Sequence, residues 1–161
     1  MLNNNFNYIN RLMAFAIFLL TFIVYFDTMA PTVSYWDCGE FIAVSHTLGV
    51  PHPPGSPFFL LLGRIFSMLP FNEDIAFRVN IISPLVSALA VMLLYLSIVK
   101  VVTHWRGKVN SLSDCLIVFG GGAAGALAFA FTDSHWFNAV EAEVYAFSTF
   151  FTAIVVWLIL L

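Results

Sequence analysis

Residues 12–26 read LMAFAIFLLTFIVYF, and every side chain in this run except Thr21 is apolar. Apart from Asp27 and Thr28 the stretch continues to residue 30, and about 20 such residues in a helix cross the roughly 30 Å of hydrocarbon in a bilayer. We therefore predict a first membrane span over residues 12–30, after a short polar lead over residues 1–10. A cleavable signal peptide with Arg11 as its basic region is the alternative, and the apolar stretches that follow favour the span.

The composition excludes a soluble globular domain. Of the 161 residues, 61% are hydrophobic and 9% are Asp, Glu, Lys or Arg, whereas soluble domains are about 45–50% apolar and about 25% charged. So few charged groups do not cover a water-facing surface of this size, which makes lipid the main solvent. The chain has no run of Lys or Arg, which argues against nucleic acid as a partner. Cys38 and Cys115 fall on opposite membrane faces in the topology below and are not expected to pair.

Three further apolar stretches follow, over residues 75–102, 114–132 and 140–161. The predicted fold is therefore all-α, a polytopic transmembrane helical protein with about four spans. The sequence stops inside the fourth span. We accordingly expect residues 1–161 to be the N-terminal part of one transmembrane domain.

The third span is rich in small residues. Gly121 and Gly125 have the spacing that lets the backbones of neighbouring helices approach closely, so packing is their expected role. Ser113 or Asp114 is expected to begin this span, and residues 133–138 are predicted to be a polar loop after it.

The long outer connection between the first two spans, residues 31–74, is predicted to contain two short helices. Ser34 or Asp37 can cap the first helix, which Gly49 ends. The next residues, VPHPPG, cannot be helical because three prolines fix φ and remove backbone donors. A second helix of about 13 residues begins at Pro57, and its length of about 20 Å is too short to cross a bilayer. We expect these helices to lie in the membrane interface.

A cytoplasmic N-terminus places four basic residues inside and two outside, in agreement with the positive-inside rule. The inside residues are Arg11, Lys100, Arg106 and Lys108, and the outside residues are Arg64 and Arg78. All acidic residues except Asp114 then fall outside. Because acids contribute little to orientation, this asymmetry directs the search for a functional site to the outer face.

Asp37 and Glu40, in the sequence SYWDCGEF, form the first candidate site. Three residues apart, they share one helical face, where a carboxylate can take a proton from an attacking hydroxyl or help to hold a divalent metal ion. The alternative is structural, because Asp-x-x-Glu is also the pattern of a capping box. Spacing alone favours the cap, although one residue can serve both purposes.

His52, in the proline-rich turn, is the second candidate, with His46 six residues upstream. Near neutral pH a histidine binds phosphate when protonated and a metal ion when neutral. The alternative is a turn residue that hydrogen-bonds a backbone carbonyl.

Glu141, Glu143 and Tyr145, at the mouth of the fourth span, form the third candidate. Carboxylates this close to hydrocarbon suggest a function, whereas glutamates at a helix start are also favoured by the helix dipole. Two residues apart on a helix, at most one glutamate faces a shared pocket, and we select Glu143 with Tyr145. Arg64 and Arg78 could meet a lipid phosphate, with snorkelling to the interface as their alternative role.

Two motifs in the outer loop, DCGEF at residues 37–41 and LGVPHPPG at residues 48–55, resemble a bacterial family of membrane proteins long catalogued as a domain of unknown function. That family is related to a vertebrate transmembrane O-mannosyltransferase, and both are assigned to the GT-C superfamily of glycosyltransferases. The resemblance is strongest over residues 28–70, with AEVY at residues 142–145 as weaker support. Ser56 stands where the family more often has an aromatic residue.

The resemblance implies an inverting membrane glycosyltransferase that moves a mannose-like sugar from a polyprenyl-phosphate donor to a hydroxyl of a protein or glycan. It implies the periplasmic face of a bacterial inner membrane, and Asp37 as the general base. Glu40 would position the acceptor or support a divalent metal ion, and His52 or Arg64 would contact the donor phosphate. Such enzymes have more than four spans, so this fragment is expected to be inactive alone. No cofactor is certain on these grounds.

Two other function classes compete with the enzyme. A transporter or channel subunit would use Pro84, the glycine run of the third span and the outward carboxylates as a cation path. The acids lie at the surface rather than at the midplane, which counts against this hypothesis. An assembly or scaffold protein without chemistry is the third hypothesis.

Overall fold

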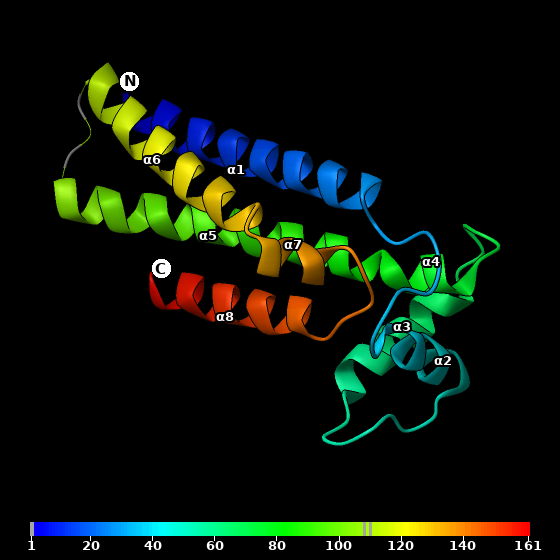
Figure 1. Ribbon diagram of the computed structural model, residues 1–161. Coiled ribbons are helices and arrows are strands. Elements are labelled where there is room, and N and C mark those ends of the chain that lie inside the picture. Colours follow the sequence, from blue (N-terminus) through cyan, green and yellow to red (C-terminus); the bar gives the residue numbers. More distant parts are fainter. Residues whose placement is uncertain (1, 108, 110) are drawn as a thin grey trace.

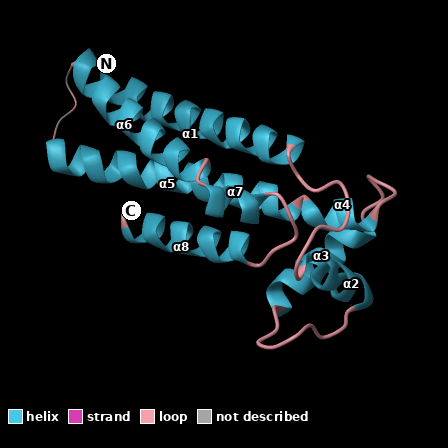
Figure 2. Ribbon diagram, in the orientation of Figure 1, coloured by secondary structure: helices cyan, strands magenta, loops and turns pink. Residues whose placement is uncertain are grey.

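The structure is a computed structural model that describes residues 2–107, 109 and 111–161. It confirms the all-α fold, since no strand occurs among those residues (Figure 2). The helices are α1 (Leu2–Asp27), α2 (Cys38–Thr47), α3 (Pro57–Met68), α4 (Ile75–Asn80), α5 (Ile82–Arg106), α6 (Leu112–Ala130), α7 (Asp133–Ala139) and α8 (Tyr145–Ile159).

Three helical stretches are long and apolar enough to cross a membrane, namely Asn5–Asp27, Ile75–Arg106 and Leu112–Ala130. Helix α5 is central, because it packs against α1, α6 and α8. In Figure 1 both chain ends lie at one end of this bundle, and α2 and α3 lie at the other. The expected fourth span, residues 140–161, contains α8. This helix has 15 residues, fewer than the about 20 that a span needs, so the span count stays approximate.

Helix α1 begins well before the predicted span. The polar lead predicted over residues 1–10 is helical from Leu2 onward and continuous with the span. The ring of Phe6 stacks on that of Phe119 in α6, with centroids 4.8 Å apart. This contact extends the packed face of α1 through the Asn-rich segment, so tertiary packing outweighs its polar composition.

The second apolar stretch contains a break at one residue. Helix α4 ends at Asn80 and α5 begins at Ile82, with Ile81 between them. Pro84 lies in the first turn of α5, where a missing backbone donor is tolerated. The amide that Pro84 lacks is the one that would have bonded the Asn80 carbonyl and continued the helix.

Helix α6 packs closely on α5, as its small residues predict, but through a partly different pair of glycines. A Cβ on Gly122 would lie 2.8 Å from Val99 Cγ2, and one on Gly125 would lie 3.0 Å from Ile98 Cδ1. A Cβ on Gly121 would meet no described atom within 4 Å. The spacing of the small residues therefore predicted correctly that α6 packs closely on a neighbour, but Gly121 does not lie on the packed face.

The start of α6 is fixed by a capping box. The Ser111 hydroxyl accepts from the Asp114 amide at 3.1 Å, and the Asp114 carboxylate accepts from the Ser111 amide at 3.2 Å. The helix thus begins earlier than the predicted Ser113 or Asp114. Arg106 at the end of α5 donates to Asp114 at 2.8 Å and ties the two helices together. Lys108, assigned above to the inner loop, lies outside the described residues.

Residues 133–138 form part of helix α7, so the prediction of a loop is wrong. Trp136 Nε1 donates to Thr28 Oγ1 at 3.1 Å, and the buried His135 ring meets the Tyr25 ring edge-on. Tyr25 in turn donates its hydroxyl to the Ala130 carbonyl at 2.8 Å. These contacts with the end of α1 order a segment whose composition alone is typical of a loop.

Helices α2, α3 and α4, residues 38–80, form what we call the outer-loop module (Figure 1). Its two short helices were predicted, and α3 has Pro57 in its first turn as expected. A Cβ on Gly63 of α3 would overlap the Ser45 side chain of α2, at 2.8 Å from its Cβ. Helix α2 ends at Thr47, and its C-cap residue Leu48 takes the left-handed conformation (φ 55°) that Gly49 was expected to supply.

Candidate active site

Asp37 lies at the point where the outer loop turns into α2. Trp36, directly before it, has a φ of 57°, a conformation that non-glycine residues seldom adopt and that is frequent at functional sites. Asp37 is the N-cap residue of α2, and Glu40 lies in the first turn. This geometry presents both carboxylates at the same end of the helix.

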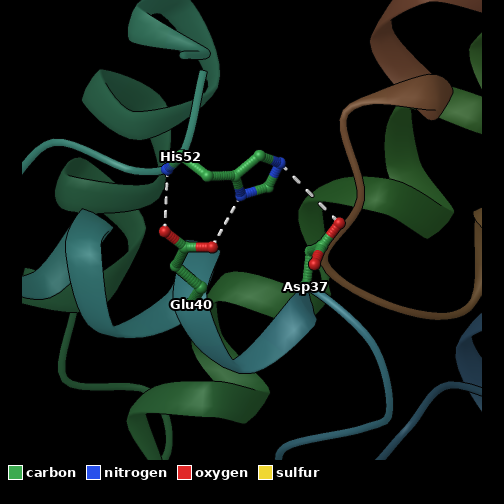
Figure 3. Close-up of side chains that lie close together, drawn as sticks. All are labelled: Asp37, Glu40 and His52. Atoms are coloured by element: carbon green, nitrogen blue, oxygen red, sulfur yellow. Dashed lines mark hydrogen bonds and ion pairs between the residues drawn. The ribbon is translucent and has the colours of Figure 1, made fainter. Parts of the chain in front are cut away.

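His52 joins these carboxylates from the proline-rich turn (Figure 3). Its backbone amide donates to Glu40 Oε1 at 2.8 Å, and its Nδ1 lies 2.7 Å from Glu40 Oε2. Its Nε2 lies 3.8 Å from Asp37 Oδ2. The imidazole is therefore held on one side by Glu40 and faces Asp37 with the other. The side chain of Asp37 is 57% exposed, so it is open to a substrate.

The Glu40–His52 pair favours the charged forms of both groups. The hydrogen bond from the imidazole lowers the pKa of Glu40 below its ordinary value. The same hydrogen bond raises the pKa of His52, with further contributions from the negative charges of Glu40, Asp37 and Glu143. The same pairing therefore stabilises the protonated imidazole and the ionised Glu40 carboxylate relative to their neutral forms.

The capping-box interpretation of Asp37 and Glu40 is wrong in this structure. Asp37 occupies the N-cap position, but its side chain makes no capping hydrogen bond. The Glu40 carboxylate, which a capping box would direct to the backbone of residue 37, instead bonds His52 twice. Removing this structural explanation strengthens the interpretation of both acids as functional groups.

Glu141 and Glu143 lie in the loop before α8 rather than on the helix, and both are buried. The helical spacing from which we expected at most one of them to face a shared pocket therefore does not apply. The Ser34 hydroxyl donates to Glu141, and the Glu143 amide donates to Ser83 Oγ at 3.5 Å. Burial raises the pKa of Glu143, and the charges of Glu141 and Asp37 raise it further. Glu143 thus interacts electrostatically with the Asp37 cluster, whereas the side chain of Tyr145 is exposed.

The outer arginines cap helices. Arg64 donates to the His46 carbonyl near the end of α2, and Arg78 donates to the carbonyls of Ser67 and Leu69 at 2.7 and 3.0 Å. The last carbonyls of a helix lack intrahelical partners, so these contacts stabilise the ends of α2 and α3. The structure does not bring Arg64 into the cluster of Asp37, Glu40 and His52, and His46 lies apart from it as an exposed residue.

Asn80 is a positioning residue that the sequence analysis missed. Its fully buried side chain donates from Nδ2 to the carbonyls of Ala30 and Thr32 at 2.8 and 2.9 Å. Its Oδ1 accepts a weak hydrogen bond from Cys38 Sγ at 3.7 Å. One side chain thus holds both the start of the outer loop and the start of α2. The available signal was a single asparagine among the apolar residues of the second span.

Asp37, Glu40 and His52 also have the geometry of a cation site. One ligand atom from each lies within 4.8 Å of the other two. Carboxylate oxygens bind hard divalent cations, and a neutral imidazole adds a nitrogen ligand for transition metals.

Comparison with known proteins agrees with the resemblance found in the motifs. The chain matches the family described as the protein O-mannosyl-transferase TMEM260 N-terminal domain over residues 37–161. It is 32% identical over 145 residues to the protein O-mannosyl-transferase tmem260 of Dictyostelium discoideum. It is 31% identical over 140 residues to the protein O-mannosyl-transferase TMEM260 of Mus musculus. No solved structure matches the chain significantly.

These matches cover most of this chain but a small part of the relatives. They include 88% and 86% of the chain, against 16% of the Dictyostelium protein and 18% of the mouse protein. The matched region contains α2 with its two acids, the His52 turn and all later helices. Its apolar helices make this an integral membrane protein. The chain belongs to the family of TMEM260 N-terminal domains.

Proposed function

We propose that this chain carries the catalytic loop of a GT-C-type protein O-mannosyltransferase, with Asp37 as the general base. The names of both relatives support transfer of mannose to protein. The observation that carries the proposal is the cluster itself, in which the exposed carboxylate of Asp37 lies beside the hydrogen-bonded Glu40–His52 pair. We place this cluster on the periplasmic face of a bacterial inner membrane, with the N-terminus in the cytoplasm.

In the proposed reaction a Ser or Thr hydroxyl of the acceptor attacks the anomeric carbon of the mannose. Asp37 accepts the hydroxyl proton, which makes the oxygen a stronger nucleophile. The bond from the anomeric carbon to the polyprenyl-phosphate oxygen breaks, and the phosphate leaves with the electron pair. Attack from the face opposite the leaving group inverts the anomeric centre.

The residues around Asp37 have supporting roles in this proposal. Glu40 holds the imidazolium of His52 in place, and His52 faces the negative charge that develops on the leaving phosphate. Arg64 is a second candidate contact for this phosphate, which it could reach only after releasing the His46 carbonyl. Glu143, in the loop before α8, and Tyr145, the first residue of that helix, are proposed substrate contacts.

The same site could instead function with a bound divalent cation. Ligand atoms within 4.8 Å of one another suit a divalent ion, whose bonds to oxygen are about 2.0–2.6 Å long. When bound, the ion would supply positive charge to the leaving phosphate. Ligation by His52 would require a neutral imidazole, which can bind the ion with one ring nitrogen and donate to a carboxylate with the other. Transfer that stops with a chelator and resumes with Mn²⁺ or Mg²⁺ supports the metal form, whereas transfer in the presence of chelator supports the imidazolium form.

The test is an Asp37→Asn substitution in the full-length protein. We expect mannose transfer to the acceptor protein to fall by about 10²-fold or more, since a general base contributes roughly 10²–10⁴, while expression stays normal. Glu73→Gln is the matched control, because Glu73 is an exposed carboxylate of the same loop that lies outside the cluster. Unchanged transfer by Asp37→Asn would remove the catalytic assignment, and loss of an ion flux instead would favour the transporter hypothesis.

A further inference from the structure

Two connecting segments meet next to the candidate active site. Residues 28–37 lead from α1 to α2, and residues 140–144 lead from α7 to α8. The Ala30 amide donates to the Val140 carbonyl at 2.8 Å, so the segments are in direct contact near their starts. Figure 1 shows both at the junction between the bundle and the outer-loop module. The first segment ends in the proposed general base, and the second contains a proposed substrate contact, Glu143.

A side-chain hydrogen bond joins the same segments again, closer to Asp37. The Ser34 hydroxyl donates to Glu141 Oε2, although the two residues are 107 positions apart in the sequence. Glu141 is only 2% exposed, and a hydrogen bond in such surroundings is stronger than one in water. Because a hydrogen bond fixes both distance and angle, this contact holds the backbone three residues before Asp37.

The direction of the Asp37 side chain depends on that backbone. The side chain makes no capping hydrogen bond, and its contact with His52 Nε2 is 3.8 Å long, which is beyond hydrogen-bond range. The residue directly before it, Trp36, has a φ of 57°. Such a conformation persists only where the surrounding structure holds it. The anchors of residues 28–37 therefore decide where the Asp37 carboxylate points.

The Ser34–Glu141 hydrogen bond can be removed without releasing the whole segment. Asn80 donates to two carbonyls near the start of the segment, at 2.8 and 2.9 Å, and these bonds do not involve Ser34. The loop that carries Glu141 is short and is held by a helix on each side. Loss of the bond should accordingly loosen residues 33–36 while the module stays folded.

We propose that Glu141 is a positioning residue of the transferase, which orients Asp37 through its hydrogen bond with Ser34. The inference rests on the proposed function, because it assigns Glu141 to the residue proposed as the general base. A general base must lie within hydrogen-bond reach of the proton that it accepts. A misplacement of about 1 Å can cost about 10²-fold in rate, so an anchor three residues away is sufficient to control the reaction.

The test removes each end of the hydrogen bond in the full-length protein. We expect Ser34→Ala and Glu141→Ala each to lower kcat by about 10–10²-fold, with KM for the sugar donor unchanged. The double variant should lose no more than either single variant, since both act through one bond. Glu141→Gln keeps an oxygen that can accept from Ser34, so it should retain most of kcat. Ser134→Ala, which removes an exposed hydroxyl from α7, is the control, and thermal unfolding gives the folded fraction to which each kcat is referred.

The Asp37→Asn background separates positioning from a general structural role. There Glu141→Ala should cause no further loss of the residual transfer, because no base is left to orient. A further loss of the same size would overturn the positioning role, as would full kcat in both single alanine variants or a Glu141→Gln variant as slow as Glu141→Ala. A raised KM with unchanged kcat would also overturn it, since that result assigns Glu141 to substrate binding. Unchanged transfer by Asp37→Asn alone would instead overturn the proposed function, on which this inference rests.

Discussion

The helix bundle and the outer-loop module are held together by different kinds of contact. In the bundle of α1, α5 and α6, buried Ala88, Val91 and Val118 belong to one apolar core, and α6 approaches α5 through Gly122. The module has an apolar core as well. Its position and helix ends, however, depend on directed hydrogen bonds from Asn80 and from the two outer arginines.

This difference corresponds to what each region has to do. Apolar packing is nearly independent of direction and tolerates exchanges of similar volume, which suffices for helices that cross a bilayer. A hydrogen bond fixes both distance and angle, which an exposed cluster needs if Asp37 is to meet a substrate in one orientation. We therefore expect single polar substitutions to be costly in the module and cheap in the bundle.

Asn80→Ala should have the largest effect on stability. It leaves the carbonyls of Ala30 and Thr32 without their donor in a part-buried environment, and each unpaired buried group costs about 1–3 kcal/mol. We expect the free energy of unfolding in detergent to fall by about 2–4 kcal/mol, with loss of mannose transfer.

Ser87→Ala is the matched substitution in the bundle. Ser87 is fully buried and its hydroxyl has no partner among the described residues, so its removal should change stability by less than about 0.5 kcal/mol. Equal destabilisation by Asn80→Ala and Ser87→Ala would contradict the contrast between the two regions.

Gly63→Ala should have the next largest effect, because the new Cβ would overlap Ser45 where α3 crosses α2. Overpacking of this kind costs about 1–3 kcal/mol, and the shift of α3 should also lower transfer. The double variant Gly63→Ala/Ser45→Gly should recover much of the loss in thermal unfolding. Gly120→Ala, where a Cβ meets no described atom within 4 Å, should be neutral, and an equal loss there would point to a general intolerance of alanine instead.

The sequence was sufficient for the elements that depend on local pattern. Apolar length located the long helices, and prolines located the turn between α2 and α3. The acidic residues of the outer loop were also found, and the structure brings Asp37 and Glu40 together with His52. Their catalytic roles stay predictions.

The rest depended on contacts between residues distant in sequence. Helix α7 forms because Trp136 and His135 meet the end of α1. Asn80 gains its role from carbonyls about 50 residues away. No periodicity within one segment carries such information. The capping-box prediction failed for a related reason, since Glu40 has a better partner in His52, 12 residues further on.

Glu143→Gln should affect mannose transfer and stability in opposite directions. Burial raises the pKa of Glu143, so the folded state favours the protonated acid, and its contribution is lost as pH rises through the folded pKa. Glutamine resembles the protonated form, so we expect a small rise in melting temperature at pH 7 together with lower mannose transfer. Asp133→Asn, an exposed acid at the start of α7, should change neither. A lower melting temperature for Glu143→Gln would mean that the ionised carboxylate has a structural partner.

The smallest expected effect is the pH dependence of the His52 turn. The hydrogen bond to Glu40 raises the pKa of His52 above its ordinary value of 6.5, so the contribution of His52 is present below 6.5 and is lost as pH rises through the folded pKa. The pKa of Glu40 is lowered from 4.5, so its contribution is present above 4.5 and is lost as pH falls through the folded value. The turn is therefore most stable between these limits.

Titration of ¹⁵N-labelled histidine by NMR should give His52 a midpoint above 6.5, and Glu40→Gln should return it toward 6.5. Asp37→Asn should move the midpoint less, because Asp37 lies 3.8 Å from the imidazole while Glu40 lies at 2.7 Å. A midpoint that Glu40→Gln leaves unchanged would mean that His52 is positioned by the turn alone.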